Sequence, residues 1–261
     1  MTLFKKTLTA FAVTSLFVAT PILANNSCNV NLSGQVNIDK STIEFFAEDN
    51  NKQSLYKIEN DKSLLINNSS VSLTAKQQAL VTQYSQNIKA LVPQVETVVV
   101  EGVELAIDGV NLAFNGLLGE GNQLAKNLTQ ELEVIRDDAL ARYSLEKGFT
   151  VGGDNDELQA DEFESKIESA VERSITNSMG VILIALGQEM LSANGEGENF
   201  ETRMEKFGET IEVEMESRTE AIEAKAQELC HAIAKVDVIE EQLKSSIDAL
   251  SNINVVTVSV K

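Results

Sequence analysis

The sequence has little of the residue types on which most enzymes and metal centres depend. Among its 261 residues there are one histidine, two cysteines, no tryptophan and 5% aromatic residues. Structural zinc sites are built from cysteine and histidine, and nucleophilic catalysis needs an activated nucleophile beside a base. We therefore expect no catalytic residue, no bound metal ion and no cofactor, and we expect the protein not to be an enzyme.

The single histidine, His231, directly follows Cys230 in a charged, helix-like segment. Neighbouring side chains on an α-helix diverge by about 100°, so these two residues cannot face one another as a cysteine–histidine catalytic pair. We interpret His231 as a structural residue.

Two segments carry incomplete ligand-binding patterns. Segment 152–162, GGDNDELQADE, is acidic like an EF-hand calcium loop, but Leu158 occupies the third ligand position and the required glycine is missing. Segment 116–121, GLLGEG, has neither the lysine nor the preceding strand of a phosphate-binding loop. We expect the first to be an exposed connecting loop, with weak calcium binding as an open alternative, and the second to be the glycine-rich C-terminal end of a helix.

Basic residues are scarce. Lysine and arginine number 21 against 40 aspartate and glutamate residues, which gives a formal charge of -19. A protein with this much negative charge repels nucleic acid and anionic lipid. Acids and bases alternate along the helix-like segments, so these charges are typical of solvated helix faces.

The first 24 residues have the parts of a secretory signal peptide. Lys5 and Lys6 precede an apolar run, which Pro21 and Ala24 close. A retained membrane anchor is the alternative, but threonines and a serine interrupt the run of about 20 apolar residues that an anchor needs. Removal of segment 1–24 leaves 19 basic residues and a formal charge of -21. We expect a soluble periplasmic protein.

The two cysteines, Cys28 and Cys230, both remain after cleavage of the signal peptide. An even pair in an oxidising compartment predicts a disulfide. This bond would close a loop of almost the whole mature chain, for which loop-closure entropy predicts a stabilisation of about 5 kcal/mol. A redox-active cysteine is the weaker alternative, because neither residue has a neighbouring cysteine or a cationic setting.

Residues 25–73 are predicted to form a small β subdomain. Short runs of β-branched and aromatic residues are separated there by clusters rich in asparagine, aspartate and serine. The candidate strands are 42–47, 54–59, 63–66 and 70–73. An antiparallel meander is the expected arrangement.

Residues 74–253 are predicted to form a bundle of long helices. Thr74 and Gln77 make a capping-box signature at its start. The expected helices cover 74–92, Pro93 to about 118, 122–147, 161–193 and a long segment from about 200 onward, with Pro93 as a break between the first two. The tail, 254–261, alternates again and could form one strand that returns to the N-terminal sheet. The fold class is therefore α+β, mainly α.

Small residues recur at a spacing of 4-3-4-3 in the second of these helices. On a helix they share one face, nearly opposite a polar stripe, and such a face lets another helix approach closely. The predicted helix-packing seam consists of Gly102, Ala106, Gly109, Ala113 and Gly116.

The same helix carries four acidic residues between positions 95 and 118, which argues against a transmembrane segment. The apolar stretch 179–186 is too short to span a bilayer. We expect no transmembrane segment in the mature chain, and peripheral insertion stays an alternative.

Several stretches together resemble a known family. They are the N-terminal cysteine followed by short strands, SLTAKQQALVTQYSQNIKALVPQVE at 72–96, ITNSMGVILIALGQEM at 175–190, and a final helix with Phe207–Gly208 and Leu229–Cys230. The chain is similar in these features to the YggN family of periplasmic proteins, which has no assigned function. The acidic charge and the long NVVTVSVK tail depart from that family. The resemblance implies a periplasmic location and adds no active residue.

The absence of catalytic motifs and the long amphipathic helices favour a non-catalytic interaction or scaffolding protein, with an unknown envelope protein as partner. The alternative is a binder of lipid or another apolar ligand between the helices. Its support is the aliphatic, tryptophan-free composition and four methionines, which are Met179, Met190, Met204 and Met215.

Overall fold

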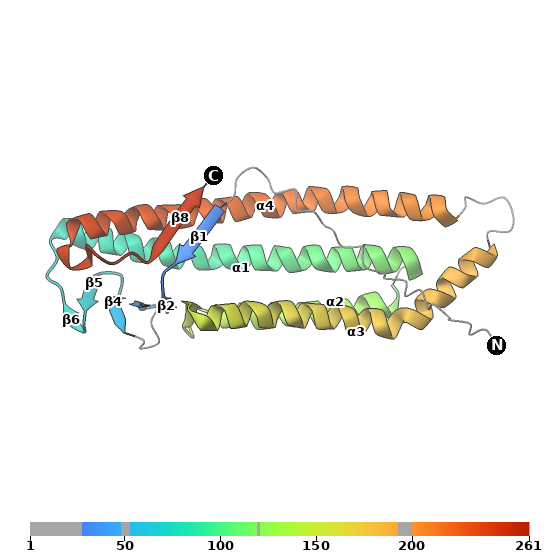
Figure 1. The fold of residues 1–261 in the computed structure, drawn as a ribbon, viewed down its shortest axis with the longest axis horizontal. Coiled ribbons are helices and arrows are strands. Elements are labelled where there is room, and N and C mark those ends of the chain that lie inside the picture. The colour runs from blue at the N-terminus through green and yellow to red at the C-terminus, as the bar shows by residue number, and fades with distance from the viewer. Residues whose placement is uncertain (1–27, 48–52, 119–120, 193–199, 261) are drawn as a thin grey trace, which may run out of the picture.

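The computed structural model of the protein describes residues 28–47, 53–118, 121–192 and 200–260. The predicted signal peptide, 1–24, lies outside them. Within these ranges the chain forms an elongated molecule, with a β-sheet at one end and long helices along its length (Figure 1). The helices are α1 (Ala75–Leu118), α2 (Gln123–Arg142), α3 (Asp154–Ser192) and α4 (Phe200–Ser246). The predicted α+β, mainly helical class is confirmed.

Six strands form one antiparallel sheet near the N-terminal end of α1. In chain order they are β2 (Gln35–Ile38), β3 (Thr42–Phe46), β4 (Ser54–Glu59), β5 (Ser63–Ile66), β6 (Ser69–Ser70) and β7 (Phe149–Gly152). Their spatial order is β6-β5-β4-β3-β2-β7. Strands β2 to β6 make a meander, and β7 pairs with β2 at the edge opposite β6. A separate two-stranded antiparallel ribbon pairs β1 (Cys28–Leu32) with β8 (Val256–Val260).

Alternation along the strands explains which face of the sheet is buried. Val36 and Ile38 of β2 and Phe45 of β3 are buried, and the residues between them are partly exposed. The turn after β4 contains Asn60 and Asp61 at φ angles of 50° and 61°, a region that these two residue types tolerate. The asparagine-rich and aspartate-rich clusters therefore act as the turns that the sequence indicates.

Two strand predictions need correction. The expected strand 70–73 is wrong, because β6 covers only Ser69–Ser70 and the chain then leaves the sheet for the cap of α1. The segment around Gly152, expected as a loop, includes β7, where Phe149 pairs with Ile38. The C-terminal strand, β8, is present, but its partner is β1 and not the six-stranded sheet.

Helix α1 is continuous through Pro93, so the predicted break at this residue is wrong. Proline removes one backbone N–H from the helix, which usually kinks it. Pro93 itself is exposed, and its neighbour Val92 is buried in the packed face of α1. Tertiary packing on that face holds the helix together. The capping box at the start of α1 is confirmed, since the Thr74 N–H donates to Gln77 Oε1 at 2.8 Å.

The ends of the next two helices also differ from the predictions. Asn122 caps α2 through an Oδ1 that accepts the Ala125 N–H at 2.8 Å, as expected, but the helix ends at Arg142 and not at 147. The residues between Arg142 and Phe149 connect this helix to β7. Helix α3 begins at Asp154 and not at 161, so most of the acidic segment 152–162 is helix and not a loop.

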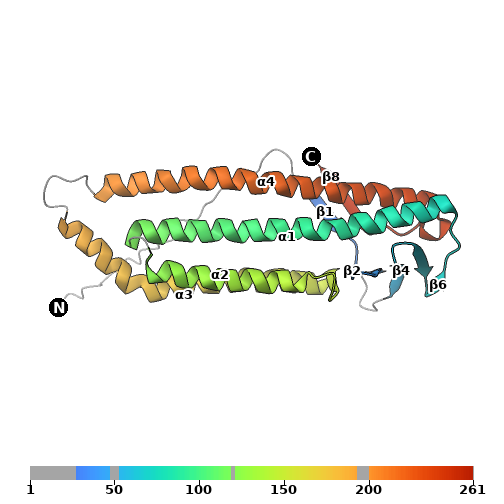
Figure 2. The ribbon, with the colours of Figure 1, turned by 180° about the vertical axis from the view of Figure 1, so that it is seen from behind.

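Two hydrophobic cores follow each other along the molecule. One joins the six-stranded sheet to the first half of α1 and the last part of α4. The other joins the second half of α1 to α2 and α3. Helix α1 lies between α4 and the α2–α3 pair, as both views show (Figures 1 and 2). No described helix combines the length and apolar composition that crossing a bilayer requires.

Candidate functional site

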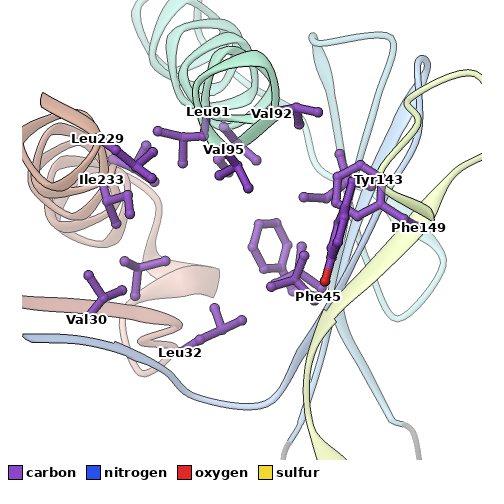
Figure 3. Close-up of a pocket in the computed structure, with 16 residues that line it drawn as sticks. Val30, Leu32, Phe45, Leu91, Val92, Val95, Tyr143, Phe149, Leu229 and Ile233 are labelled. Atoms are coloured by element: carbon purple, nitrogen blue, oxygen red, sulfur yellow. The ribbon is translucent and has the colours of Figure 1, made fainter. Parts of the chain in front are cut away.

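An apolar cavity of about 440 Å³ lies where the six-stranded sheet, α1, α4 and the β1–β8 ribbon meet (Figure 3). Its lining residues come from elements that are far apart in the sequence. They are Val30, Leu32, Val36, Ile38, Phe45, Ile88, Leu91, Val92, Val95, Tyr143, Phe149, Val151, Leu229, Ile233, Val236 and Val256.

The helical wall follows from residue spacing. On α1 the lining positions are 88, 91, 92 and 95, which recur at i, i+3, i+4 and i+7 and so share one face. On α4 the positions 229, 233 and 236 do the same. The cavity is therefore lined by the apolar faces of two amphipathic helices and by the sheet.

The floor of the cavity is formed by the sheet and by the end of α2. Phe45 of β3 stacks on Tyr56 of β4 with ring centroids 4.3 Å apart, which fixes the deepest aromatic ring. Tyr143, just after α2, meets Phe149 of β7 edge to face at 5.5 Å. Both rings are visible beside the sheet in Figure 3.

Within the part of the chain that the structure describes, almost no polar side chain lines this cavity. Tyr143 is the only lining residue whose side chain carries an oxygen or a nitrogen, and the other fifteen are aliphatic residues or phenylalanine. General acid–base and nucleophilic catalysis both need titratable side chains at the reacting atoms. This lining can bind an apolar molecule, and it offers no group of that kind besides one phenol.

Two acids of α4, the buried Glu240 and the half-buried Asp237, hold β8 in the wall of the cavity. The Glu240 carboxylate, on a residue that is only 2% exposed, accepts the N–H of Val255 at 2.6 Å and of Val256 at 2.9 Å. Asp237 accepts the N–H of Val258 at 3.0 Å. Burial raises the pKa of the Glu240 carboxyl, although the two backbone N–H groups oppose this shift.

A pair of buried tyrosines lies close to Glu240. The hydroxyls of Tyr56 and Tyr84 are 3.2 Å apart and share one hydrogen bond, in which one donates and the other accepts. Burial, together with the negative charge of Glu240, raises the pKa of both phenols well above 10. These groups are therefore neutral structural partners in the core that joins the six-stranded sheet to α1 and α4, the proximal core; the core of α1, α2 and α3 is the distal core.

Cys28 and Cys230 form a disulfide, with Cα atoms 6.2 Å apart. The bond joins β1 to α4 directly beside the cavity, since Val30 and Leu229 are lining residues close to it in the sequence. Cys28 is exposed, whereas Cys230 is 5% exposed. His231 is exposed on α4, next to a cysteine that is already bonded.

The predicted seam of small residues faces α4 over part of its length. A β-carbon at Gly116 would overlap the ring of Phe207, and one at Gly109 would contact Met215 Sδ at 3.5 Å. A β-carbon at Gly102 would meet nothing within 4 Å. Ala106 is exposed and Ala113 is half-buried. Of these three glycines, Gly116 thus lies closest to an α4 side chain, and Gly102 faces open space.

The polar stripe of α1 links it to both neighbours. Glu101 pairs with Lys225 and Asp108 with Arg218, both on α4. On the other side, Glu104 pairs with Arg136 of α2 at 2.9 Å. These acids thus fix the register of the helices.

Sequence reasoning missed the cavity. The sequence signal for it was limited to apolar helical spacing, at 88, 91, 92 and 95 on α1 and at 229, 233 and 236 on α4. The methionines do not mark it: Met179 is exposed, Met215 contacts the α1 seam, and the side chains of Met190 and Met204 lie outside what the structure describes. The strands β1 and β7 supply lining residues that no local pattern connects to the helices.

Comparison with known proteins gives one match. A family model described as a protein of unknown function, DUF2884, matches residues 28–256. None of the curated proteins and none of the solved structures matches the chain. The matched range includes both cysteines and every residue that lines the cavity. Because the match covers most of the sequence, the chain belongs to the DUF2884 family.

Proposed function

We propose that the protein is a non-catalytic binder of the hydrocarbon part of a lipid, or of a similarly apolar ligand, in the cavity between the sheet, α1 and α4. The observation that carries this proposal is the cavity itself. Its volume of about 440 Å³ lies in the range of small-molecule sites, and fifteen of its sixteen lining residues are aliphatic or phenylalanine.

The physical reason is the cost of leaving such a space unfilled. Apolar cavities hold water poorly because water finds no hydrogen-bond partners there, and an empty space forfeits dispersion contacts. A hydrocarbon chain would restore these contacts and remove its own surface from water, at about 25 cal/mol per Å². None of the described residues that line the cavity is charged, so a charged head group would stay outside.

The periplasmic location is part of this proposal. It is supported by the signal-peptide pattern in 1–24, by the disulfide between Cys28 and Cys230, and by the resemblance to the YggN family. A binder of apolar molecules in that compartment would act on components of the envelope.

A binding assay tests the proposal directly. N-phenyl-1-naphthylamine, an uncharged probe that fluoresces in apolar surroundings, should bind the wild-type protein. Val95→Trp should weaken this binding by about tenfold or more, or about 1.4 kcal/mol, because the indole fills space that the probe needs. The matched control is Val134→Trp on α2, where the valine is 68% exposed.

The control variant should bind the probe like the wild type. Native mass spectrometry of the gently purified protein should also reveal a retained lipid, which Val95→Trp loses. Equal probe affinity in wild type and Val95→Trp would refute ligand binding in this cavity.

The second candidate is the interaction or scaffolding role. It is favoured by apolar side chains that the far part of α3 exposes, with Met179, Leu183 and Ile184 at 51%, 62% and 63% exposure. Exposed apolar surface of this kind is typical of protein-contact sites. If Met179 is replaced by a photoreactive amino acid, crosslinking should capture one envelope protein reproducibly. Crosslinks to many proteins without a reproducible partner would count against this role.

A further inference from the structure

Strand β1 covers one side of the cavity while standing apart from the main sheet. It pairs with β8 alone among the described strands, and four of its five residues are exposed. Yet Val30 and Leu32 line the cavity, and Val30 is 41% exposed. Figure 3 shows both side chains on the ribbon opposite the α1 wall. A thin, solvent-facing strand therefore separates the cavity from solvent on this side.

The two ends of β1 are held in different ways. At its C-terminal end the chain turns into β2 through Gly34, which has a φ of 92° that only glycine adopts readily. The Ser33 N–H donates to Val255 O at 2.7 Å and fixes this corner. At its N-terminal end, the disulfide from Cys28 to Cys230 ties the strand to α4.

By contrast, β8 is fixed to α4 along its length. Glu240 accepts the N–H groups of Val255 and Val256, and Asp237 accepts that of Val258. Val256 is 8% exposed. In the β1–β8 ribbon, β8 is thus held in place by hydrogen bonds to α4. Strand β1 is held by its pairing with β8 and by the attachments at its two ends.

We infer that β1 is the lid of the apolar cavity and that the Cys28–Cys230 disulfide is the latch that keeps this lid closed. The inference rests on the proposed ligand binding. A five-residue strand that is tied at both ends cannot swing out of its ladder. Isolated two-stranded pairing is marginal in water, so a strand released at its Cys28 end opens about the corner at Gly34.

Removal of the latch should change the rates of ligand exchange. In Cys28→Ser/Cys230→Ser, N-phenyl-1-naphthylamine should dissociate about tenfold faster or more in stopped-flow displacement, because access no longer waits for a tethered strand to distort. The matched control, Leu128→Ala, removes a buried side chain from the distal core and leaves the lid intact. Its dissociation rate should equal that of the wild type. Equal rates in the double serine variant and the wild type would overturn the inference.

A ligand-free measurement separates the lid from the ligand proposal. In the double variant, hydrogen exchange of the amides in Cys28–Leu32 should accelerate more than that of the amides in β3 and β4, whose change reports the overall loss of stability. Failure of the wild type to bind the probe would refute the proposed function, and the exchange pattern would still report on the latch. Loss of the bond also lowers the stability of the whole fold, so the comparison is made between segments. An acceleration in Cys28–Leu32 no larger than that in β3 and β4 would overturn the latch, because the bond would then hold the whole fold and not one strand.

Discussion

At the scale of single residues, the glycines of α1 differ in what surrounds them. Glycine costs a helix about 1 kcal/mol relative to alanine. Gly102 faces open space, so nothing in the packing compensates for that cost. Gly116 lies against the ring of Phe207, which a β-carbon would displace. The same residue type is therefore a weak point at one position and a packing requirement at the other.

This difference predicts opposite effects for the same substitution. Gly102→Ala should raise the free energy of unfolding by up to about 1 kcal/mol through helix propensity. Gly116→Ala should lower it by about 1 kcal/mol or more, because overpacking against Phe207 outweighs that gain. Urea unfolding followed by circular dichroism measures both. A stabilised Gly116→Ala would mean that α4 does not pack closely there.

At the scale of secondary-structure elements, the attachment of β8 to α4 depends on a buried carboxylate. Glu240→Gln leaves one acceptor oxygen and turns an amide NH₂ toward a backbone N–H. The variant should lose about 1–3 kcal/mol of unfolding free energy, since one buried donor is left unpaired. The matched control is Glu241→Gln, whose exposed side chain pairs only with Lys244 across one turn. Its stability should stay within about 0.5 kcal/mol of the wild type.

The pKa of Glu240 fixes the sign of the pH dependence. Its folded pKa is raised above the ordinary 4.5, so the folded state binds more protons than the unfolded state in this range. The contribution of this group to stability is complete below 4.5 and is lost as the pH rises through the folded pKa. The stability difference between wild type and Glu240→Gln should therefore shrink with rising pH. A difference that grows with pH would contradict the raised pKa.

At the scale of the whole molecule, the two cores lie at different distances from the cavity. The proximal core contains the sheet and the cavity walls, and the distal core joins α1, α2 and α3. Helix α1 runs through both. Because few side chains are shared, damage to one core should open that region first.

Leu128→Ala tests this independence. Leu128 is 1% exposed in the distal core, and its truncation should cost about 2–5 kcal/mol locally. Hydrogen exchange should accelerate in α2 and in the part of α3 that packs on it, while β3 to β5 and the affinity for N-phenyl-1-naphthylamine stay unchanged. Equal loss of protection in the sheet would show that the cores unfold as one unit.

Local sequence patterns were sufficient for much of the framework. The capping box at Thr74, the cap at Asn122 and the alternation in β3 to β5 each involve residues within a few positions of one another. The pair of cysteines indicated the disulfide from number and compartment alone. The chemistry of these features is complete within a short segment or a residue count, so the sequence by itself determined them.

The tertiary structure alone decided the rest. Pro93 stays inside α1 because packing of the opposite face outweighs one lost backbone hydrogen bond. Strand β7 forms because an edge of β2 is open to it, and β8 pairs with β1 because the disulfide and Glu240 bring them together on α4. The cavity exists only where β1, β2, β3, α1, the end of α2, β7, α4 and β8 meet. Volume enclosed between elements depends on how they pack, and no spacing within one element records it.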